Sequence, residues 1–197
     1  NASVVDVYYN TDLLLAPSSE VRGVEHPGQP FPLVLSDLPP IPPAVFDNCT
    51  LSAPKVVIPV DGVGSIDAGC HGELEAKQGS TVTLTGGVYK FKQWDIKNKV
   101  NITATAPTTI YVRQNVRTQQ DTNIQPASGN PDDLSFFVGA DSGKRSTLGG
   151  FNLFVGTFVD TNDPELNIRK QIVIVGTVVA IKVKLRSVHE DRIPACG

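Results

Sequence analysis

Methionine is absent from this 197-residue chain, and runs of Ala, Glu, Leu and Lys at helical spacing are almost absent as well. Only residues 73–78 could form a helical turn. The 17 glycines and 15 prolines instead favour strands and turns. A chain of this length can bury roughly 70% of its unfolded surface. The composition therefore predicts a single all-β domain that needs no metal or disulfide scaffold to fold.

An excess of positive charge is also missing, because the net charge is −3 and the pI is near 5.6. Nucleic-acid binders usually carry a strongly basic face or tail, so the net charge argues against this class. The longest apolar run, Ile172 to Ile181, is about half the ~20 residues that a membrane helix needs. We predict no membrane span. The chain begins at Asn1 without a methionine, which is typical of a processed chain, so we expect an extracellular or cell-surface protein whose signal peptide has been removed.

Cysteine is scarce, with Cys49, Cys70 and Cys196 only. An odd number in an exported chain indicates one internal bridge and one cysteine left over. A disulfide between Cys49 and Cys70 would close a loop of about 20 residues, which the chain-entropy relation values at ~3 kcal/mol. Three buried, reduced thiols are the alternative.

The C-terminal half is repetitive. Val155-Gly156-Thr157 returns as Val175-Gly176-Thr177, each time among β-branched residues. Apolar triplets beginning at 110, 136, 153 and 173 recur at spacings of 26, 17 and 20, the length of one coil in a β-solenoid. A β-sandwich would need hairpin turns, and only Asp61-Gly62 fits one, so we favour the solenoid. The predicted strands are Thr81–Thr85, Val88–Ile96, Val100–Ala104, Thr108–Val116, Thr122–Gln125, Leu134–Val138, Phe151–Val159, Leu166–Ile168 and Gln171–Val188.

The N-terminus differs from this body. Residues 1–15 are strongly apolar and predict a strand, whereas residues 16–59 hold ten of the fifteen prolines and must run extended. We therefore divide the chain into a strand arm at 1–15, a proline-rich linker and loop-rich join at 16–73, and a solenoid body at 74–197. The arm could close its own fold or complete a neighbour's sheet. Its predicted subunit-interface residues are Val4, Val5, Val7, Tyr8, Tyr9, Leu13, Leu14 and Leu15.

Several phrases of the body resemble a known domain. They are Gly87-Val88-Tyr89-Lys90-Phe91, Val100-Asn101-Ile102, Pro107 to Val112, Asp133 to Gly139, Gly156 to Val159 and Gly176 to Ala180. Together they resemble the right-handed β-helix, or β-solenoid, domain of poorly characterised exported bacterial surface proteins. The resemblance covers residues 84–188 and implies a solenoid fold. It fails at Lys182 to Arg186, where such domains end in small polar residues.

No catalytic motif is present: neither a Gly-x-Ser-x-Gly elbow nor a phosphate-binding loop occurs. Acidic residues are scattered and mostly suit the capping of turns. We therefore predict no enzyme activity, no catalytic residue and no cofactor. Calcium is the one candidate ion, because oxygen ligands are clustered in one segment; the alternative there is an Asn-Asp-Pro turn. The candidate ligands are Asp160, Asn162, Asp163 and Glu165.

A solenoid leaves two open ends, which need caps or partners. Because the chain also has an apolar arm on a proline-rich linker, we predict a subunit that polymerises with copies of itself through strand exchange and end-to-end contacts. The alternative is a monomeric adhesin or carbohydrate-binding module, whose sign would be solvent-facing aromatics among Tyr89, Phe91, Trp94 and Tyr111. The alternating basic residues in Ile181 to Arg186 could be a solvated face, a protected edge, or a contact for an acidic polysaccharide or membrane surface.

Overall fold

A computed structural model shows one β-solenoid of about six turns over residues 56–184. It describes residues 3–9, 13–14, 20–21, 25–27, 49–139, 144–150, 152–161, 166–169, 172–180 and 183–186, with side chains described within these ranges from 51 to 184. Every strand pairing among them is parallel, which excludes an antiparallel sandwich and confirms the predicted all-β solenoid.

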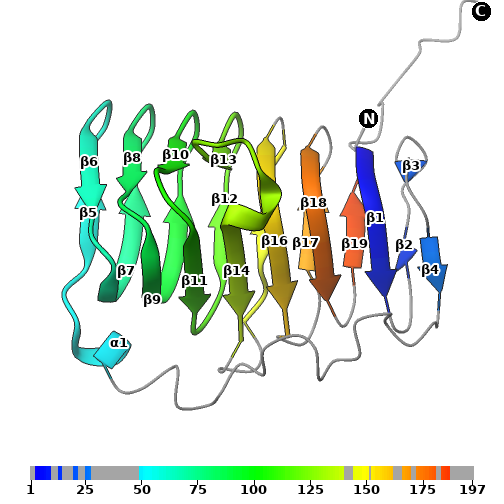
Figure 1. Cartoon of the computed structure of the whole chain (residues 1–197), viewed down its shortest axis with the longest axis horizontal. Helices are drawn as coiled ribbons and strands as arrows, with labels where there is room; N and C mark the ends of the chain where they lie inside the picture. Colours follow the sequence, from blue (N-terminus) through cyan, green and yellow to red (C-terminus); the bar gives the residue numbers. More distant parts are fainter. Residues whose placement is uncertain are drawn as a thin grey trace, which may run out of the picture.

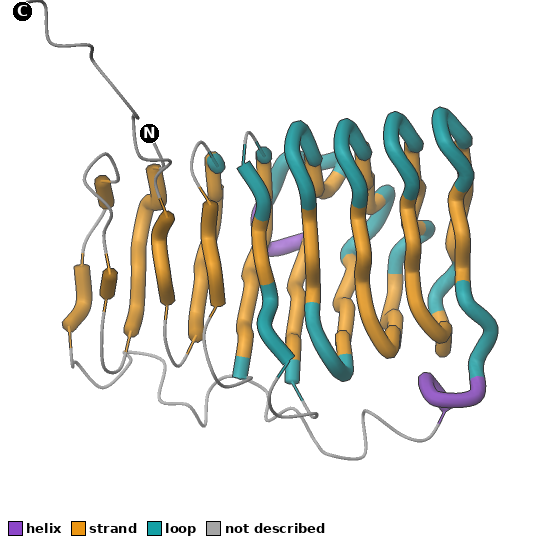
Figure 2. Tube along the Cα trace, turned by 180° about the vertical axis from the view of Figure 1, so that it is seen from behind, coloured by secondary structure: helices purple, strands orange, loops and turns teal. Residues whose placement is uncertain are grey.

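The strands form three faces that run the length of the molecule (Figures 1 and 2). The first face holds β5 (Val56–Ile58), β7 (Gly69–Ala76), β9 (Gly87–Ile96), β12 (Val116–Thr118), β15 (Thr147–Leu148), β17 (Leu166–Arg169), β19 (Val183–Arg186) and β2 (Leu13–Leu14). The second holds β6 (Val63–Ile66), β8 (Thr81–Leu84), β10 (Asn101–Ala104), β13 (Asn123–Pro126), β16 (Leu153–Asp160), β18 (Val173–Ala180), β1 (Ser3–Tyr9) and β3 (Glu20–Val21). The third adds β11 (Thr108–Val112), β14 (Leu134–Val138) and β4 (Glu25–Pro27) to the long strands β7, β9, β16, β18 and β1, which turn a corner and serve two faces.

The core is a set of apolar columns, because alternate residues of each strand point inward and the parallel register stacks them coil on coil. On the third face, Tyr89 lies in register with Ile110, and Ile110 with Phe136. On the first face Trp94 lies between Leu74 and Val116 and is fully buried. Its ring meets Phe91 and Phe136 edge to face, at centroid distances of 5.4 and 4.9 Å. Burial of these columns supplies most of the stabilisation.

The repeated Val-Gly-Thr forms one corner of the solenoid. Its two copies pair residue by residue, Gly156 with Gly176 and Thr157 with Thr177, so the period predicted from this motif is confirmed. Both glycines have positive φ, 150° and 128°. A Cβ on Gly156 would lie 2.5 Å from the carbonyl oxygen of Leu134, and one on Gly176 would collide with the carbonyl oxygen of Gly156. The motif therefore needs glycine at this corner for two reasons: the backbone has positive φ, and a Cβ would collide with the neighbouring coil.

A second corner is held by buried polar side chains. The Asn152 carboxamide accepts from the backbone N–H of Thr122 and donates to the hydroxyl of Thr118, both at 2.9 Å. The same hydroxyl accepts from the N–H of Gly149 at 2.8 Å. All three side chains are buried, and each polar group finds a partner in the adjacent coil. This network anchors the long coil that leads from Arg117 to its register partner Thr147.

The structure corrects three details of the sequence prediction. The solenoid begins at Val56 and not at residue 74, because β5 and β6 pair with β7 and β8 and complete the first coil. The predicted strand at 108–116 is two strands, β11 and β12. The equivalence of the triplets at 136 and 153 is wrong, since Phe136 lies in register with Phe158 and not with Leu153.

Coil length is uneven, which explains the wrong equivalence. The coil from Arg117 to Thr147 is much longer than the coil from Leu166 to Val183, although each pair lies in register on the same face. The extra residues of the longer coil are accommodated in its loops. A fixed period in the sequence cannot follow that variation.

Candidate functional site

The end of the solenoid that is formed by β5 and β6 is the first candidate for a functional surface. Among the strands that the structure describes, β5 pairs with β7 alone and β6 with β8 alone, so their outer edges face no other strand. Large apolar side chains are exposed around this edge: Val57 is 45% exposed, Val60 58% and Val63 81%. The helix α1 (Cys49–Ser52) packs on β7 beside them (Figure 1) and leaves Leu51 exposed as well. Unpaired edges with apolar surroundings are association surfaces.

The opposite end is continued by the N-terminal strands. Residues 1–15, which the sequence predicted to be a strand, contain β1 and β2. β1 pairs in parallel with β18 of the same chain, and β2 pairs with β19. Val4 lies in register with Ile174, and Val7 with Val178; the register shifts between Val4 and Asp6. Of the predicted interface residues, Leu15 lies outside the described residues and the others are described by backbone only. In this structure the arm therefore continues its own solenoid.

β19 is an inner strand here, because it pairs with β17 on one side and β2 on the other. The interpretation of its alternating basic residues as edge protection is therefore wrong. Of these residues only Lys184 has a described side chain, and it is half-buried on the outer side of the first face.

The cysteines are partly accounted for. Cys70 lies on β7 and is disulfide-bonded. Cys49 begins α1, which packs against β7, but its side chain and all of Cys196 lie outside the described part of the chain. The pairing of Cys49 with Cys70 stays a prediction.

The predicted calcium site lies mostly outside the described residues, so it stays a prediction. Asp160 is the last residue of β16 and is 2% exposed, so it belongs to a strand and not to a turn. Asn162, Asp163 and Glu165 lie outside the described residues. Within the described ranges, no three His, Cys, Asp or Glu side chains come close enough together to hold a metal ion.

The aromatic candidates for a carbohydrate-binding face are mostly core. Tyr89, Phe91 and Trp94 are fully buried, and the Tyr89 hydroxyl donates to the carbonyl of Ile66 at 2.9 Å. Tyr111 is half-buried and stacks on Phe137 at a centroid distance of 5.4 Å. An exposed aromatic row therefore does not form from these four residues.

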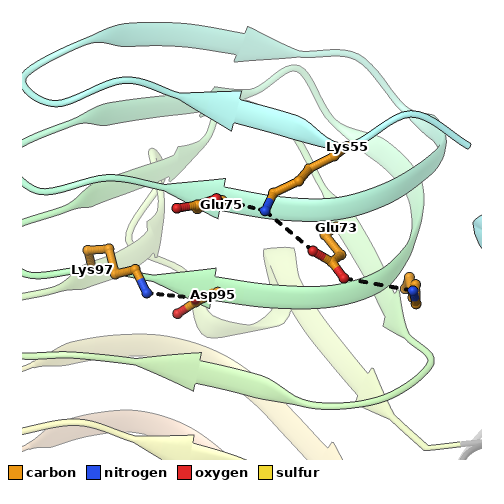
Figure 3. A network of polar contacts seen from close by, with 6 residues as sticks. Lys55, Glu73, Glu75, Asp95 and Lys97 are labelled. Atoms are coloured by element: carbon orange, nitrogen blue, oxygen red, sulfur yellow. Dashed lines mark hydrogen bonds and ion pairs between the residues drawn. The ribbon is translucent and has the colours of Figure 1, made fainter.

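The outer side of the first face carries a network of ion pairs in its early coils (Figure 3). The ammonium group of Lys55 lies 2.7 Å from the carboxylate of Glu75 and 3.4 Å from that of Glu73. Lys97 lies 2.7 Å from Asp95 in the next coil. The hydrogen bond from Lys55 lowers the pKa of Glu75, and the same contact raises the pKa of Lys55.

This pair gives a prediction about pH. Glu75 stabilises the fold at pH values above its unfolded-state pKa, and this contribution is lost as the pH falls through its lowered folded-state pKa. Lys55 stabilises the fold at pH values below its unfolded-state pKa, and this contribution is lost as the pH rises through its raised folded-state pKa. Because Lys55 is exposed and Glu75 is only half-buried, solvent screens the pair and we expect a small change in stability. In a Lys55→Gln variant, an NMR titration should show the pKa of Glu75 returning toward its ordinary value. An unchanged titration would contradict the pairing, and Asp95, which has its own partner, is the internal control.

Farther along the same face, every charged residue of the strands is basic. β12, β15, β17 and β19 contain no acidic residue. Arg117 is in register with Thr147, Thr147 with Asn167 and Asn167 with Lys184, so these four residues form one outer row. A pocket of about 110 Å³ opens beside it, lined by Arg145, Thr147, Asn167 and Arg169. Of this surface, only Lys184 belongs to the basic stretch that the sequence singled out. The other members were not predicted, because they come from separate coils of unequal length and only the register brings them together.

No family of known proteins, no curated protein and no solved structure matches the chain. The described residues contain no helix long and apolar enough to cross a membrane.

Proposed function

We propose that this protein is a non-enzymatic structural subunit that assembles end to end into an extracellular or cell-surface filament. The observation that carries the proposal is the open first coil, where the outer edges of β5 and β6 pair with no other described strand and exposed valines lie around them. A parallel solenoid that meets a matching coil continues all three of its hydrogen-bonded faces at once. Repeated head-to-tail contact of this kind gives an open filament when the rotation does not close.

The residues on either side of β5 restrict which partners can pair with this edge. Pro54 and Pro59 lie on either side of β5, so only the four residues between them can donate a backbone N–H to another strand. Such a short edge discourages indiscriminate sheet formation and favours a partner of the same coil geometry. A second copy of this chain has that geometry at its other end.

The N-terminal arm supplies a second contact by strand exchange. β1 binds to β18 through parallel pairing that any copy of the chain could provide, so the arm of one subunit can occupy the same place on a neighbour. Copies of this chain are thus the proposed partners. The resemblance to exported bacterial surface proteins supports the location, and a Cys49–Cys70 disulfide would suit it.

Adding positive charge at the open edge tests the end-to-end contact between subunits. In a Val57→Lys/Val63→Lys double variant, two ammonium groups flank the open edge, and we expect assemblies to disappear while the circular dichroism spectrum is retained. Light scattering and negative-stain microscopy measure the loss. Val88→Lys is the matched control, because Val88 is 50% exposed but lies on β9, away from the open edge. Fibres that form equally in both variants would contradict end-to-end assembly.

Strand exchange is tested by a cross-link. Asp6 of β1 and Thr177 of β18 are paired in register, so cysteines at both positions should form a disulfide. In a Cys196→Ser background, exchange predicts covalent multimers on a non-reducing denaturing gel. A purely intramolecular link would show that the arm stays on its own chain.

A further inference from the structure

We infer that the basic outer row of the first face binds an acidic polysaccharide, a property independent of filament assembly. The row consists of Arg117, Thr147, Asn167 and Lys184, with Arg169 beside it. Adjacent strands are about 4.8 Å apart, so Arg117 and Lys184 lie about 14 Å from each other along the solenoid axis. A polymer that runs along this axis would meet a cation at both ends of the row and polar groups between them.

The charge arrangement indicates an anionic ligand. In the early coils of this face, cations and carboxylates neutralise each other in ion pairs. In the later coils, Arg117, Arg169 and Lys184 have no ion pair with any described residue, and Arg169 lies in register with Arg186. Like charges opposite each other on neighbouring strands are destabilising. A bound anion would remove that cost, and the chain carries this patch despite a net charge of −3.

The polar groups between the cations indicate which class of anion binds there. The Thr147 side chain is half-buried and that of Asn167 is 4% exposed, and both line the pocket together with the two arginines Arg145 and Arg169. A half-buried hydroxyl at the centre of a cationic row suits a ligand that has hydroxyl groups as well as carboxylates or sulfates. Arginine adds paired N–H donors that match such oxyanions. Acidic polysaccharides combine these features.

Two other anionic polymers fit less well. Single-stranded nucleic acid is held by aromatic platforms as well as cations, and the outward residues of β12, β15 and β17 include no aromatic side chain. A membrane surface is held by apolar side chains inserted beside the cations, and none points outward from these three strands.

The test is calorimetric titration of the full chain with oligogalacturonate, which carries carboxylates, and with heparin oligosaccharide, which carries sulfates. We expect binding of at least one of them that weakens as salt rises, and none of neutral dextran. An Arg117→Gln/Arg169→Gln/Lys184→Gln variant should bind at least tenfold more weakly, since each charge-assisted contact is worth about tenfold in affinity. Comparison of the two oligosaccharides identifies the preferred anionic group.

Two controls distinguish a specific binding site from nonspecific electrostatic attraction. Lys97→Gln removes a cation from the same face, but one that is paired with Asp95, and should change affinity by less than about twofold. Thr147→Val keeps every charge and removes one hydroxyl of the pocket, and should weaken binding about threefold. The inference is overturned if neither oligosaccharide binds, if all variants bind equally, or if single-stranded DNA or phosphatidylglycerol vesicles bind more tightly than both.

Discussion

Replacing Trp94 by alanine is expected to lower the free energy of unfolding by about 4 kcal/mol, the usual cost of removing a large aromatic side chain from a packed core. Trp94 is fully buried in the column between Leu74 and Val116. Its ring also joins Phe91 to Phe136, residues that come from different coils. The cavity would therefore weaken the contact between successive coils as well as the local packing. Chemical denaturation followed by circular dichroism measures the change.

Trp94→Phe is the matched variant. It keeps an aromatic ring against Phe91 and Phe136, and it removes an indole N–H for which no acceptor is found among the described residues. A buried donor without a partner is costly, so its loss partly compensates for the smaller ring. We expect a loss well below that of the alanine variant. Equal losses in the two variants would show that ring packing between coils is not what makes Trp94 important.

Replacing Gly176 by alanine is expected to cost at least about 3 kcal/mol, because backbone strain and steric collision add together. The φ of 128° is unfavourable for any residue with a Cβ, and the added carbon would strike the carbonyl oxygen of Gly156 in the preceding coil. That oxygen belongs to a strand paired on both sides and cannot move aside easily. Thermal and denaturant unfolding both report the loss.

Gly129→Ala separates the two contributions. Gly129 also has positive φ, 71°, but nothing lies within 4 Å of the position that its Cβ would take. Its substitution should therefore cost only the conformational part, about 1 kcal/mol. If Gly176→Ala costs no more than Gly129→Ala, the close approach of the coils at the Val-Gly-Thr corner does not limit the sequence there.

Assembly and ligand binding use different parts of the same scaffold. The proposed filament contact lies at the first coil, around Val57 and Val63, whereas the basic row starts at β12 and runs along the side. If coils of adjacent subunits continue each other, the rows of successive subunits come to lie along one side of the filament. Multivalent binding of a long anionic chain would follow from that arrangement. The two proposals remain separable, because Val57→Lys acts at the open first coil and Arg117→Gln acts at a later coil of the same face.

What the sequence determined by itself is the kind of fold. Alternation of apolar residues, the paired Val-Gly-Thr motifs and the scarcity of hairpin turns are local signals, and together they predicted parallel coils over the C-terminal half. The burial of Tyr89 and Phe91 agrees with this alternation, because a polar residue lies between them on the same strand. The first coil escaped prediction because β5 and β6 are short strands that lie among prolines and glycines.

Only the tertiary structure decided which residues become neighbours. Coils of unequal length place Phe136 on Phe158, and they bring Arg117 and Lys184, far apart in the chain, into one row. The register depends on how much chain each loop absorbs, and loop length carries no periodic signal. The arm illustrates the same limit: its apolar pattern predicted a strand, but the pairing of β1 with β18 is a contact between the two ends of the sequence, which no local pattern specifies.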